Sequence, residues 1–411
     1  MKIGRKVADF GNSFNNFMVD GYYIELATNV VKISKKKAED LLVDRISRPE
    51  DLLDRLLIST EIEGEKSYYL VGQLAEDNQL ANSHVNKMHD KINSPIPYVC
   101  FLGAIAYYHA LNADQGDNEV EVEVEVEHMS MMLPIWLLKR EEKFSIAHKK
   151  MEERFIGEHK VKVLTPGMEK ELTITVHSAK CRNESEVARH SLKYKMVSKD
   201  QNTNVISIEK RYESERFDDY EVVLTDIGGG STDAVRLGKG LTTPKHRDSF
   251  QVIDIEPFLG YLERFRKEKL IQYFKDLRTL EKFIVNKYKV QKYVLSNENT
   301  GEEYDFTNEI VEALKEYARI LVAKILDVFI PSSTNTVLKF IYIGGEAPVL
   351  EPYIRLALLN HMSEMAAKNN HFFLNDIIQN SDKEIFAPTS RTINLAALEL
   401  KVIDEMKGQL A

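Results

Sequence analysis

A short segment in the middle of the chain combines the residue types that bind a phosphate group. An apolar run from Glu221 is rich in β-branched residues, which is typical of a buried strand. An acid, three glycines and two hydroxyl residues follow: Asp226, Gly228, Gly229, Gly230, Ser231 and Thr232. Consecutive glycines let the backbone turn at positive φ and point its N–H groups at phosphate oxygens, and a nearby carboxylate suits hydrated Mg²⁺. The segment predicts a site for a nucleotide phosphate and its metal, with a plain β-hairpin as the alternative.

The same pattern occurs near the N-terminus. A strand from Lys6 leads to Asp9, and a glycine turn then leads back into a second apolar run. We expect the residues of this turn and of the returning strand to face the phosphates: Gly11, Asn12, Ser13 and Asn15. Asp9 and Asp226 would each hold Mg²⁺ through water. Two similar segments so far apart predict a duplicated fold in which each half presents a hairpin to one nucleotide.

A third segment is a buried strand, Lys339–Ile343, that ends in two glycines. Gly344, Gly345 and Glu346 follow the strand and precede a helical stretch. The first N–H groups of a helix are free, and the dipole makes this end positive, so a helix start favours anionic ligands. Each segment alone is weak evidence, whereas three in this order indicate a nucleotide-binding protein.

With these segments the chain resembles the actin superfamily of ATPases, and within it the plasmid-segregating bacterial actins of the ParM type. Asp9–Ser13 resembles the first phosphate motif, Asp226–Asp233 the second, and Gly344–Ala347 the adenosine motif. The resemblance covers most of the chain in order, although the specific matches are short. It implies an α/β, actin-like fold of the duplicated ribonuclease H type, with two domains and a nucleotide cleft between them.

The resemblance also implies domain boundaries. Domain I would comprise residues 1–222, with a small subdomain at about 34–90, and would receive the C-terminal helix of residues 392–411. Domain II would comprise residues 223–391. Residues 193–219 are an insertion relative to ParM, and their polar, strand-like character fits a surface hairpin or a filament contact.

Further site residues follow from the resemblance. In ParM-type sequences an acid after a strand orients the attacking water, and Glu184 fits this role best, with Glu186 as its competitor. An acid that merely stabilises the start of a helix is the structural alternative. Asp226 would be the second catalytic residue. Lys267 and Glu268 resemble the actin pair that approaches the nucleoside, but a solvated helix face explains them as well.

Two positions depart from the family pattern. Actin and ParM carry a lysine in the strand after the first phosphate loop, whereas Asn15, Asn16 and Phe17 occupy that neighbourhood here. That cation is therefore absent or supplied from elsewhere. Glu346 stands where the adenosine turn usually has a third glycine, so the choice between ATP and GTP is open.

The composition excludes several classes of protein. A formal net charge of −9 argues against a chain that binds nucleic acid through an overall positive electrostatic potential. The two cysteines, Cys100 and Cys181, provide no disulfide framework and fit a reducing compartment. No signal peptide opens the sequence, and no apolar run is long enough to span a bilayer. We expect a cytoplasmic protein that binds neither nucleic acid nor membrane directly.

The resemblance implies a slow ATPase that polymerises into filaments with ATP and Mg²⁺. Such a filament would move plasmid DNA through a DNA-binding adaptor protein bound at the plasmid centromere. Two alternatives come from other classes. Asp226–Thr232 also resembles the loop of exopolyphosphatases, which would make the chain a phosphohydrolase. A scaffold actin without turnover, in which Glu184 is only structural, is the other alternative.

Overall fold

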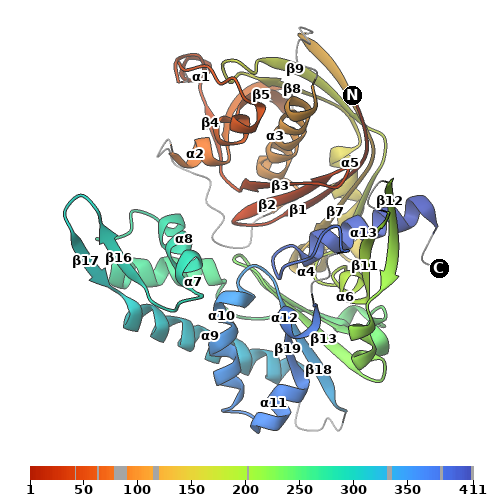
Figure 1. Ribbon diagram of the computed structural model, residues 1–411, viewed down its shortest axis with the longest axis vertical. Helices are drawn as coiled ribbons and strands as arrows, with labels where there is room; N and C mark the ends of the chain where they lie inside the picture. The colour runs from red at the N-terminus through yellow and green to blue at the C-terminus, as the bar shows by residue number, and fades with distance from the viewer. Residues whose placement is uncertain are drawn as a thin grey trace. The chain divides into compact units, whose positions relative to one another are not determined.

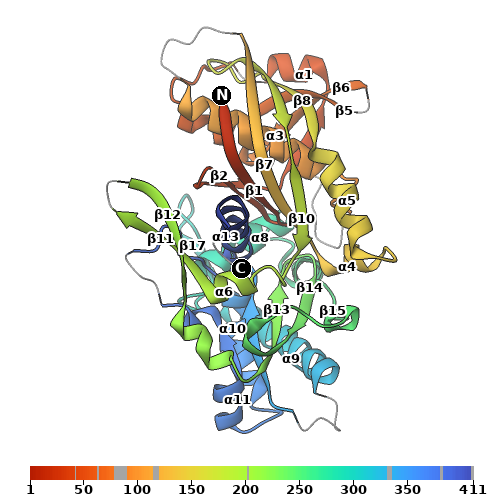
Figure 2. The same ribbon diagram turned by 90° about the vertical axis from the view of Figure 1, so that its right-hand side faces the viewer.

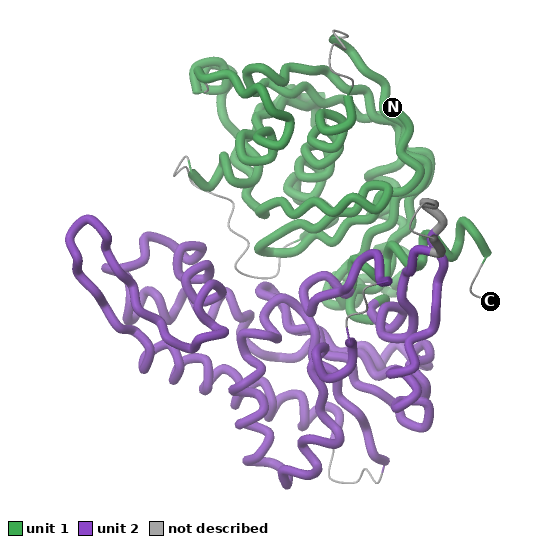
Figure 3. Tube along the Cα trace, in the orientation of Figure 1, with its two compact units in different colours: residues 1–85, 89–187, 394–411 green, residues 86–88, 188–393 purple. Residues whose placement is uncertain are grey.

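The computed structural model forms two compact units (Figure 3). The described residues of Met1–Val85, His89–Val187 and Asn394–Ala411 make up the first unit, and those of Ala188–Ile393 make up the second. The structure describes a series of ranges: 1–41, 43–62, 64–77, 90–113, 120–200, 203–330, 336–379 and 383–408.

A ten-stranded sheet runs through the described part of the first unit (Figure 1). Along the sheet the strands follow the order β3 (Tyr22–Ala27), β2 (Phe14–Val19), β1 (Lys2–Phe10), β7 (Glu121–Leu133), β9 (Lys170–Val176), β8 (Gly157–Val163), β5 (Leu57–Ile62), β6 (Glu65–Val71) and β4 (Val30–Ile33). A further strand, β10 (Ala179–Asn183), pairs with β7. Because β1 and β10 both run parallel to β7, their C-terminal ends meet at one edge of the sheet.

Helices α3 (Pro95–Asn112) and α13 (Ile393–Lys407) cover opposite faces of this sheet (Figures 1 and 2). The ammonium of Lys6 on β1 donates to the carbonyl oxygen of Phe101 on α3 at 3.1 Å. The neighbouring residue, Arg5, pairs with Glu399 on α13 at 2.6 Å. Successive side chains of a strand point to opposite faces, so the two contacts place the helices on either side. The remaining helices of this unit are α1 (Lys35–Asp40), η1 (Pro49–Arg55), α2 (Gln73–Asp77), α4 (Ile135–Lys139) and α5 (Phe144–Phe155).

The second unit repeats the central topology of the first. Its sheet has the order β15 (Phe250–Val252), β14 (Thr232–Leu237), β13 (Glu221–Ile227), β18 (Leu338–Ile343) and β19 (His371–Phe373). The antiparallel pair β13–β14 corresponds to β1–β2, and the parallel strands β18 and β19 correspond to β7 and β10. The predicted duplication is therefore confirmed. Helices α9 (Thr307–Phe329) and α10 (Ala347–Leu358) pack together beside this sheet (Figure 1).

The other elements of the second unit are shorter. They are α6 (Arg189–Lys193), η2 (Tyr212–Phe217), η3 (Lys239–Leu241), η4 (Arg247–Ser249), α7 (Phe258–Phe265), η5 (Arg266–Leu270), α8 (Leu277–Lys287), α11 (Glu364–Asn370) and α12 (Leu374–Ile377), with a hairpin of β16 (Val294–Asn297) and β17 (Glu302–Asp305).

The boundary between the units differs from the sequence prediction. Residues 188–222, which the sequence placed in domain I, belong to the second unit. They contain the hairpin of β11 (Tyr194–Asp200) and β12 (Thr203–Lys210), so the predicted insertion does form a hairpin. Arg211 forms a buried ion pair with Glu384, which ties this hairpin to a late part of the same unit. The sequence could not show this boundary, because the ion pair joins residues that are far apart along the chain.

The cores of both units rest on packing. Cys100 and Cys181 are buried and form no disulfide. Among the described residues, no helix has the length and apolar character needed to cross a bilayer.

Candidate functional site

The turn between β1 and β2 is a closely packed piece of backbone. Asp9 lies opposite Asn16 in the hairpin and is 7% exposed. At Gly11 a Cβ atom would collide with the carbonyl oxygen of Phe14, so only glycine fits. Thr28 holds the turn from behind: its hydroxyl donates to the oxygen of Gly11 and its N–H to the oxygen of Ser13, both at 2.9 Å. The first predicted phosphate loop is therefore fixed in one conformation.

Asn15, just after this turn, carries a buried amide without a partner. The residue is 1% exposed and lies opposite Phe10. Neither the nitrogen nor the oxygen of its side-chain amide has a hydrogen-bond partner among the described residues. An unsatisfied buried amide costs free energy, and such groups in native proteins usually await a ligand or water. The residues present thus fit an anionic ligand at this turn.

The second hairpin is closed by its own backbone. Asp226 lies opposite Asp233 on β14 and is also 7% exposed. The N–H of Gly228 donates to the oxygen of Ser231 at 3.0 Å, which closes the glycine turn. Gly229 accepts from the N–H of Leu259 at 2.9 Å, and a Cβ atom there would lie 2.8 Å from the Leu259 side chain. Gly230 and Thr232 complete the turn and begin β14.

The third predicted segment packs directly against this hairpin. Gly344 has φ +100°, and a Cβ atom on it would clash with the carboxylate of Asp226 and lie 2.6 Å from the oxygen of Ile227. Only glycine combines this backbone conformation with this approach. After Gly345, the N–H of Glu346 donates to the oxygen of Ile227 at 3.1 Å, and α10 begins at the next residue. The structure therefore brings the second phosphate motif and the adenosine motif together.

Glu346 is an unusual residue for this position because its carboxyl is buried. The residue is 3% exposed, and one carboxyl oxygen would lie 3.5 Å from a Cβ atom on Gly229. Burial, reinforced by the charge of Glu281, raises the pKa of Glu346 to about 8, against the opposing charges of Arg391 and Arg278. Arg278 and Glu281 form a buried pair on α8 at 2.5 Å. The sequence analysis missed these α8 residues, because nothing in a charged helix marks which side chains are buried.

Lys267 and Glu268 lie on the π-turn η5, with side chains that are 62% and 56% exposed. Lys267 pairs with Glu263 at 3.3 Å, and Glu268 with Arg264 at 3.8 Å. Both pairs lie within one continuous helical segment, which is what the solvated-face alternative expects. A nucleoside contact by Lys267 and Glu268 stays a prediction. The buried charges of this region are those of Arg266 on η5 and of Arg278 and Glu281 on α8.

Glu184 lies at the same edge of the sheet as the first hairpin. Its N–H donates to the oxygen of Leu133 at 2.9 Å, so it extends β10 alongside β7. Met131 of β7 is in register with both Ala8 and Cys181, which places the ends of β1, β7 and β10 in one row. Neighbouring strands are ~4.8 Å apart, so Glu184 lies roughly 10 Å from the end of β1.

The surroundings of Glu184 are constrained. Lys91, a buried lysine that the sequence analysis missed, lies 3.5 Å from its carboxylate. Ser185 is buried and has φ +65°, a strained conformation for a non-glycine residue and one that recurs at functional sites. Helix α6 begins only at Arg189, so Glu184 stands in a turn outside the helix. Glu186 follows two residues later, with its N–H bonded to the oxygen of Glu184 at 2.7 Å.

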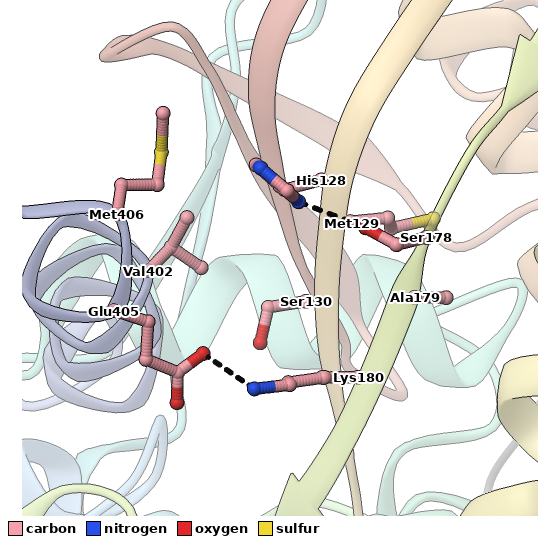
Figure 4. Close-up of a pocket in the computed structure, with 9 residues that line it drawn as sticks. All are labelled: His128, Met129, Ser130, Ser178, Ala179, Lys180, Val402, Glu405 and Met406. Atoms are coloured by element: carbon pink, nitrogen blue, oxygen red, sulfur yellow. Dashed lines mark hydrogen bonds and ion pairs between the residues drawn. The ribbon is translucent and has the colours of Figure 1, made fainter.

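A hollow of about 300 Å³ lies elsewhere in the first unit, between α13 and the strands β7 and β10 (Figure 4). It is lined by His128, Met129, Ser130, Ser178, Ala179, Lys180, Val402, Glu405 and Met406. An ion pair of 3.0 Å between Lys180 and Glu405 joins the strand to the helix there. None of the predicted site residues lines this hollow. Its lining residues on β7 and β10 lie nearer the N-terminal side of the β7–β10 pairing than the C-terminal strand ends beside Glu184.

The fold and these positions can be compared with known proteins. The crystal structure of the actin-like protein Alp7A matches the chain with 42% sequence identity and a TM-score of 0.84, over 100% of this chain and 98% of that one. The chain belongs to the Alp7A family of actin-like proteins. In keeping with this, the family model of the Alp7A C-terminal domain matches residues 221–377 of the chain. No curated protein sequence matched it.

More distant members of the superfamily share the fold with this Alp7A relative. ParM of Bacillus thuringiensis with AMPPNP is 13% identical, with a TM-score of 0.62 over 97% of this chain and 98% of that one. The ParM of a 15-stranded filament from Clostridium botulinum is 15% identical, with a TM-score of 0.60. The match covers 98% of this chain and 100% of that one. At these identities the likeness concerns the fold alone. The predicted α/β, actin-like fold and the predicted resemblance to bacterial actins are both confirmed.

Proposed function

We propose that this Alp7A-family chain binds ATP with Mg²⁺, hydrolyses it slowly and assembles into filaments. The observation that carries the proposal is the duplicated hairpin, with Asp9 and Asp226 at equivalent positions one residue before their strands end. A chance glycine turn does not repeat with an acid in the same place on the same topology. The third turn, packed on the second hairpin through Gly344, adds the feature that a nucleoside site requires.

In this proposal the two hairpins bind the phosphates. Asp9 and Asp226 would hold the metal through water, and Mg²⁺ when bound would neutralise charge on the phosphate oxygens. The backbone N–H groups of Gly11–Ser13 and Gly228–Thr232 would point at those oxygens. Asn15 would donate its unpartnered amide to the same ligand. The rigid, glycine-dependent geometry supports binding, because donors fixed in advance need no reorganisation.

Glu184 would orient the water that attacks the terminal phosphate. A carboxylate at the edge that holds the first hairpin lies within range of a water on that phosphate, and orienting groups act on exactly such a nucleophile. Its place in a turn five residues before α6 supports this role over the alternative in which it only stabilises a helix start. Turnover would be slow and would time the life of a filament.

The partners are proposed from the family and from charge. Self-association into filaments follows what ParM of Clostridium botulinum is described as forming. A chain with a formal net charge of −9 would reach a plasmid centromere through a DNA-binding adaptor, in the cytoplasm, and not by its own field. The polyphosphatase alternative rests only on the resemblance of the Asp226–Thr232 loop, whereas the 42% identical relative is an actin-like protein. The preference for ATP or GTP would depend on the contacts that the buried Glu346 makes with the nucleotide base.

The proposal is tested by following phosphate release and light scattering in one sample. With ATP and Mg²⁺ the wild type should release phosphate and scatter light above a critical concentration, and ADP should give far less polymer. Asp226→Ala should abolish both signals while its circular dichroism spectrum stays native. Full phosphate release by Asp226→Ala would remove the central assignment, and cleavage of polyphosphate without polymer would restore the phosphatase alternative. Polymer that forms with ATP but releases no phosphate would indicate a scaffold.

A further inference from the structure

The first hairpin offers no cation to the phosphates. Asn15 on β2 is neutral. Lys6 on β1 lies on the same face of the sheet as Asn15, but its ammonium donates to the carbonyl oxygen of Phe101 on α3 and lies 4.7 Å from the centre of the Phe17 ring. Burial lowers the pKa of Lys6 well below its usual range. A site that must hold a triphosphate at this turn therefore needs positive charge from another element.

Lys91 is a buried cation beside the catalytic candidate. Its side chain is only 7% exposed, and its ammonium lies 3.5 Å from the carboxylate of Glu184. The nearer oxygen of that carboxylate accepts no hydrogen bond from any described residue. An ammonium has three N–H donors. Among the described residues, the ammonium of Lys91 has one charged partner, Glu184, and the two form an ion pair without a hydrogen bond. Burying such a charge is costly unless a further partner satisfies it.

The backbone around Lys91 is fixed firmly enough to aim its side chain. Arg154 on α5 donates to the oxygen of Lys91 at 3.0 Å and to the oxygen of Ser94 at 2.5 Å. The carboxylate of Asp90 accepts from the N–H of Ile92 at 3.1 Å. The turn before α3 is thus anchored to another helix of the same unit. The backbone that carries Lys91 is therefore held by hydrogen bonds on both sides of the residue.

We infer that Lys91 supplies the cation that the first hairpin lacks, binding the terminal phosphate of the nucleotide while it holds the carboxylate of Glu184. The inference rests on the proposed ATPase function. Glu184 lies at the edge of the sheet that presents the first hairpin, roughly 10 Å from the end of β1, so a phosphate between them is within reach of Lys91. Without a cation, the negative charges of Glu184 and the phosphate would repel each other.

The role of Lys91 is electrostatic: no proton is transferred to or from its ammonium. The water oxygen forms a bond to the terminal phosphorus as the bond to the bridging oxygen breaks, and ADP leaves with that electron pair. The proton of the water passes to phosphate or solvent. Lys91 stays protonated throughout and offsets the charge on the phosphoryl oxygens.

The decisive comparison uses two variants that both lack the carboxylate. Glu184→Gln and the double variant Lys91→Met with Glu184→Gln differ only in the cation, so neither leaves an unpaired buried carboxylate. Affinities for AMPPNP and ADP, with Mg²⁺, are measured by titration of each folded variant. If Lys91 binds the terminal phosphate, the double variant should bind AMPPNP about 10- to 100-fold more weakly than Glu184→Gln, the range for a hydrogen bond to a charged group. ADP affinity should change little.

The controls separate the possible failures. Lys91→Arg keeps the charge and should retain most of the preference for AMPPNP over ADP. Lys150→Met removes an exposed cation that pairs with Glu141 on the surface of the same unit, and it should leave both affinities unchanged. Equal AMPPNP affinities in Glu184→Gln and the double variant would overturn the inference and leave Lys91 as a structural partner. A wild type that binds no nucleotide would instead refute the proposed function itself.

Discussion

The two hairpins have the same topology but present different donors. Each carries an aspartate one residue before its first strand ends, Asp9 in β1 and Asp226 in β13. The second turn contains three consecutive glycines, whereas the first has Gly11 alone. Beside the first turn stands Asn15, whose buried amide has no partner among the described residues. Both turns also carry polar side chains, so the units differ in kind: the second offers the hydroxyls of Ser231 and Thr232 beside its glycines, and the first offers the amide of Asn15.

The strands beside the hairpins differ in the same way. After β18 comes Gly344, which packs on Asp226 at a distance that admits no side chain. After the equivalent strand, β7, comes Pro134, which opens α4. Just after the next strand of the first unit, β10, Glu184 pairs with Lys91 from the turn before α3. The same scaffold therefore occurs twice, and the proposed catalytic residue Glu184 lies on only one of the two copies, the first unit.

The largest effect should come from removing the acid that only the first unit has. Glu184→Gln should slow phosphate release by about 10²–10⁴-fold, because an orienting carboxylate acts on the attacking water. Nucleotide affinity should change much less, and filaments should outlast those of the wild type. Single-turnover phosphate release is the measurement. Normal turnover in Glu184→Gln together with slow turnover in Glu186→Gln would move the role by two residues.

The next effect concerns the close contact that only the second unit has. Gly344→Ala should lower the free energy of unfolding by roughly 2–5 kcal/mol, since it adds backbone strain at positive φ to a clash with Asp226. Urea denaturation followed by circular dichroism measures the loss. The equivalent change in the first unit, Pro134→Ala, should cost much less. Equal losses at the two positions would mean that the two edges are packed alike.

A smaller effect should show whether the two aspartates act alike. Asp9→Asn and Asp226→Asn should each raise the Mg²⁺ concentration needed for half-maximal phosphate release by about 10- to 100-fold. This is the loss of metal affinity typical of outer-shell groups. Magnesium titrations of turnover test this expectation. A loss confined to one variant would show that one hairpin alone holds the metal.

The smallest effect is a pH dependence of stability that arises in the second unit. Burial raises the pKa of Glu346 from 4.5 to about 8, so the folded state binds an extra proton between these values. The contribution is present in full below the unfolded pKa and is lost as pH rises toward 8. The stability of the wild type relative to Glu346→Gln should therefore fall as the pH rises from about 4.5 to about 8 and level off above that, as measured by urea denaturation. A difference that is constant with pH would show that Glu346 is ionised throughout.

The sequence predicted what is local and missed what is brought together by folding. The glycine turns and the acids beside them are recognisable because their chemistry lies within a few consecutive residues. Lys91 escaped notice because a single lysine has no signature until Glu184 lies beside it. The boundary at residue 188 depends on a buried contact between Arg211 and Glu384, which no local pattern reveals.

Exposure was the other unpredictable property. Lys267 and Glu268, for which a nucleoside contact stays a prediction, have mostly exposed side chains. Arg278 and Glu281 have the same kinds of charge and are buried. Charged residues on successive helical turns look alike in sequence, and only the packing of α8 in the second unit distinguishes them.

The continuity of the first sheet has a mechanical consequence. Strand β5 of the small subdomain pairs with β6 on one side and with β8 on the other, so hydrogen bonds run unbroken from that subdomain to β1. Among the described residues, the stretch that the sequence assigns to a small subdomain is therefore joined to its unit through paired strands, and tilting it requires the whole sheet to bend or shear. A load applied there would be carried elastically along the strands to the turn that holds Asp9.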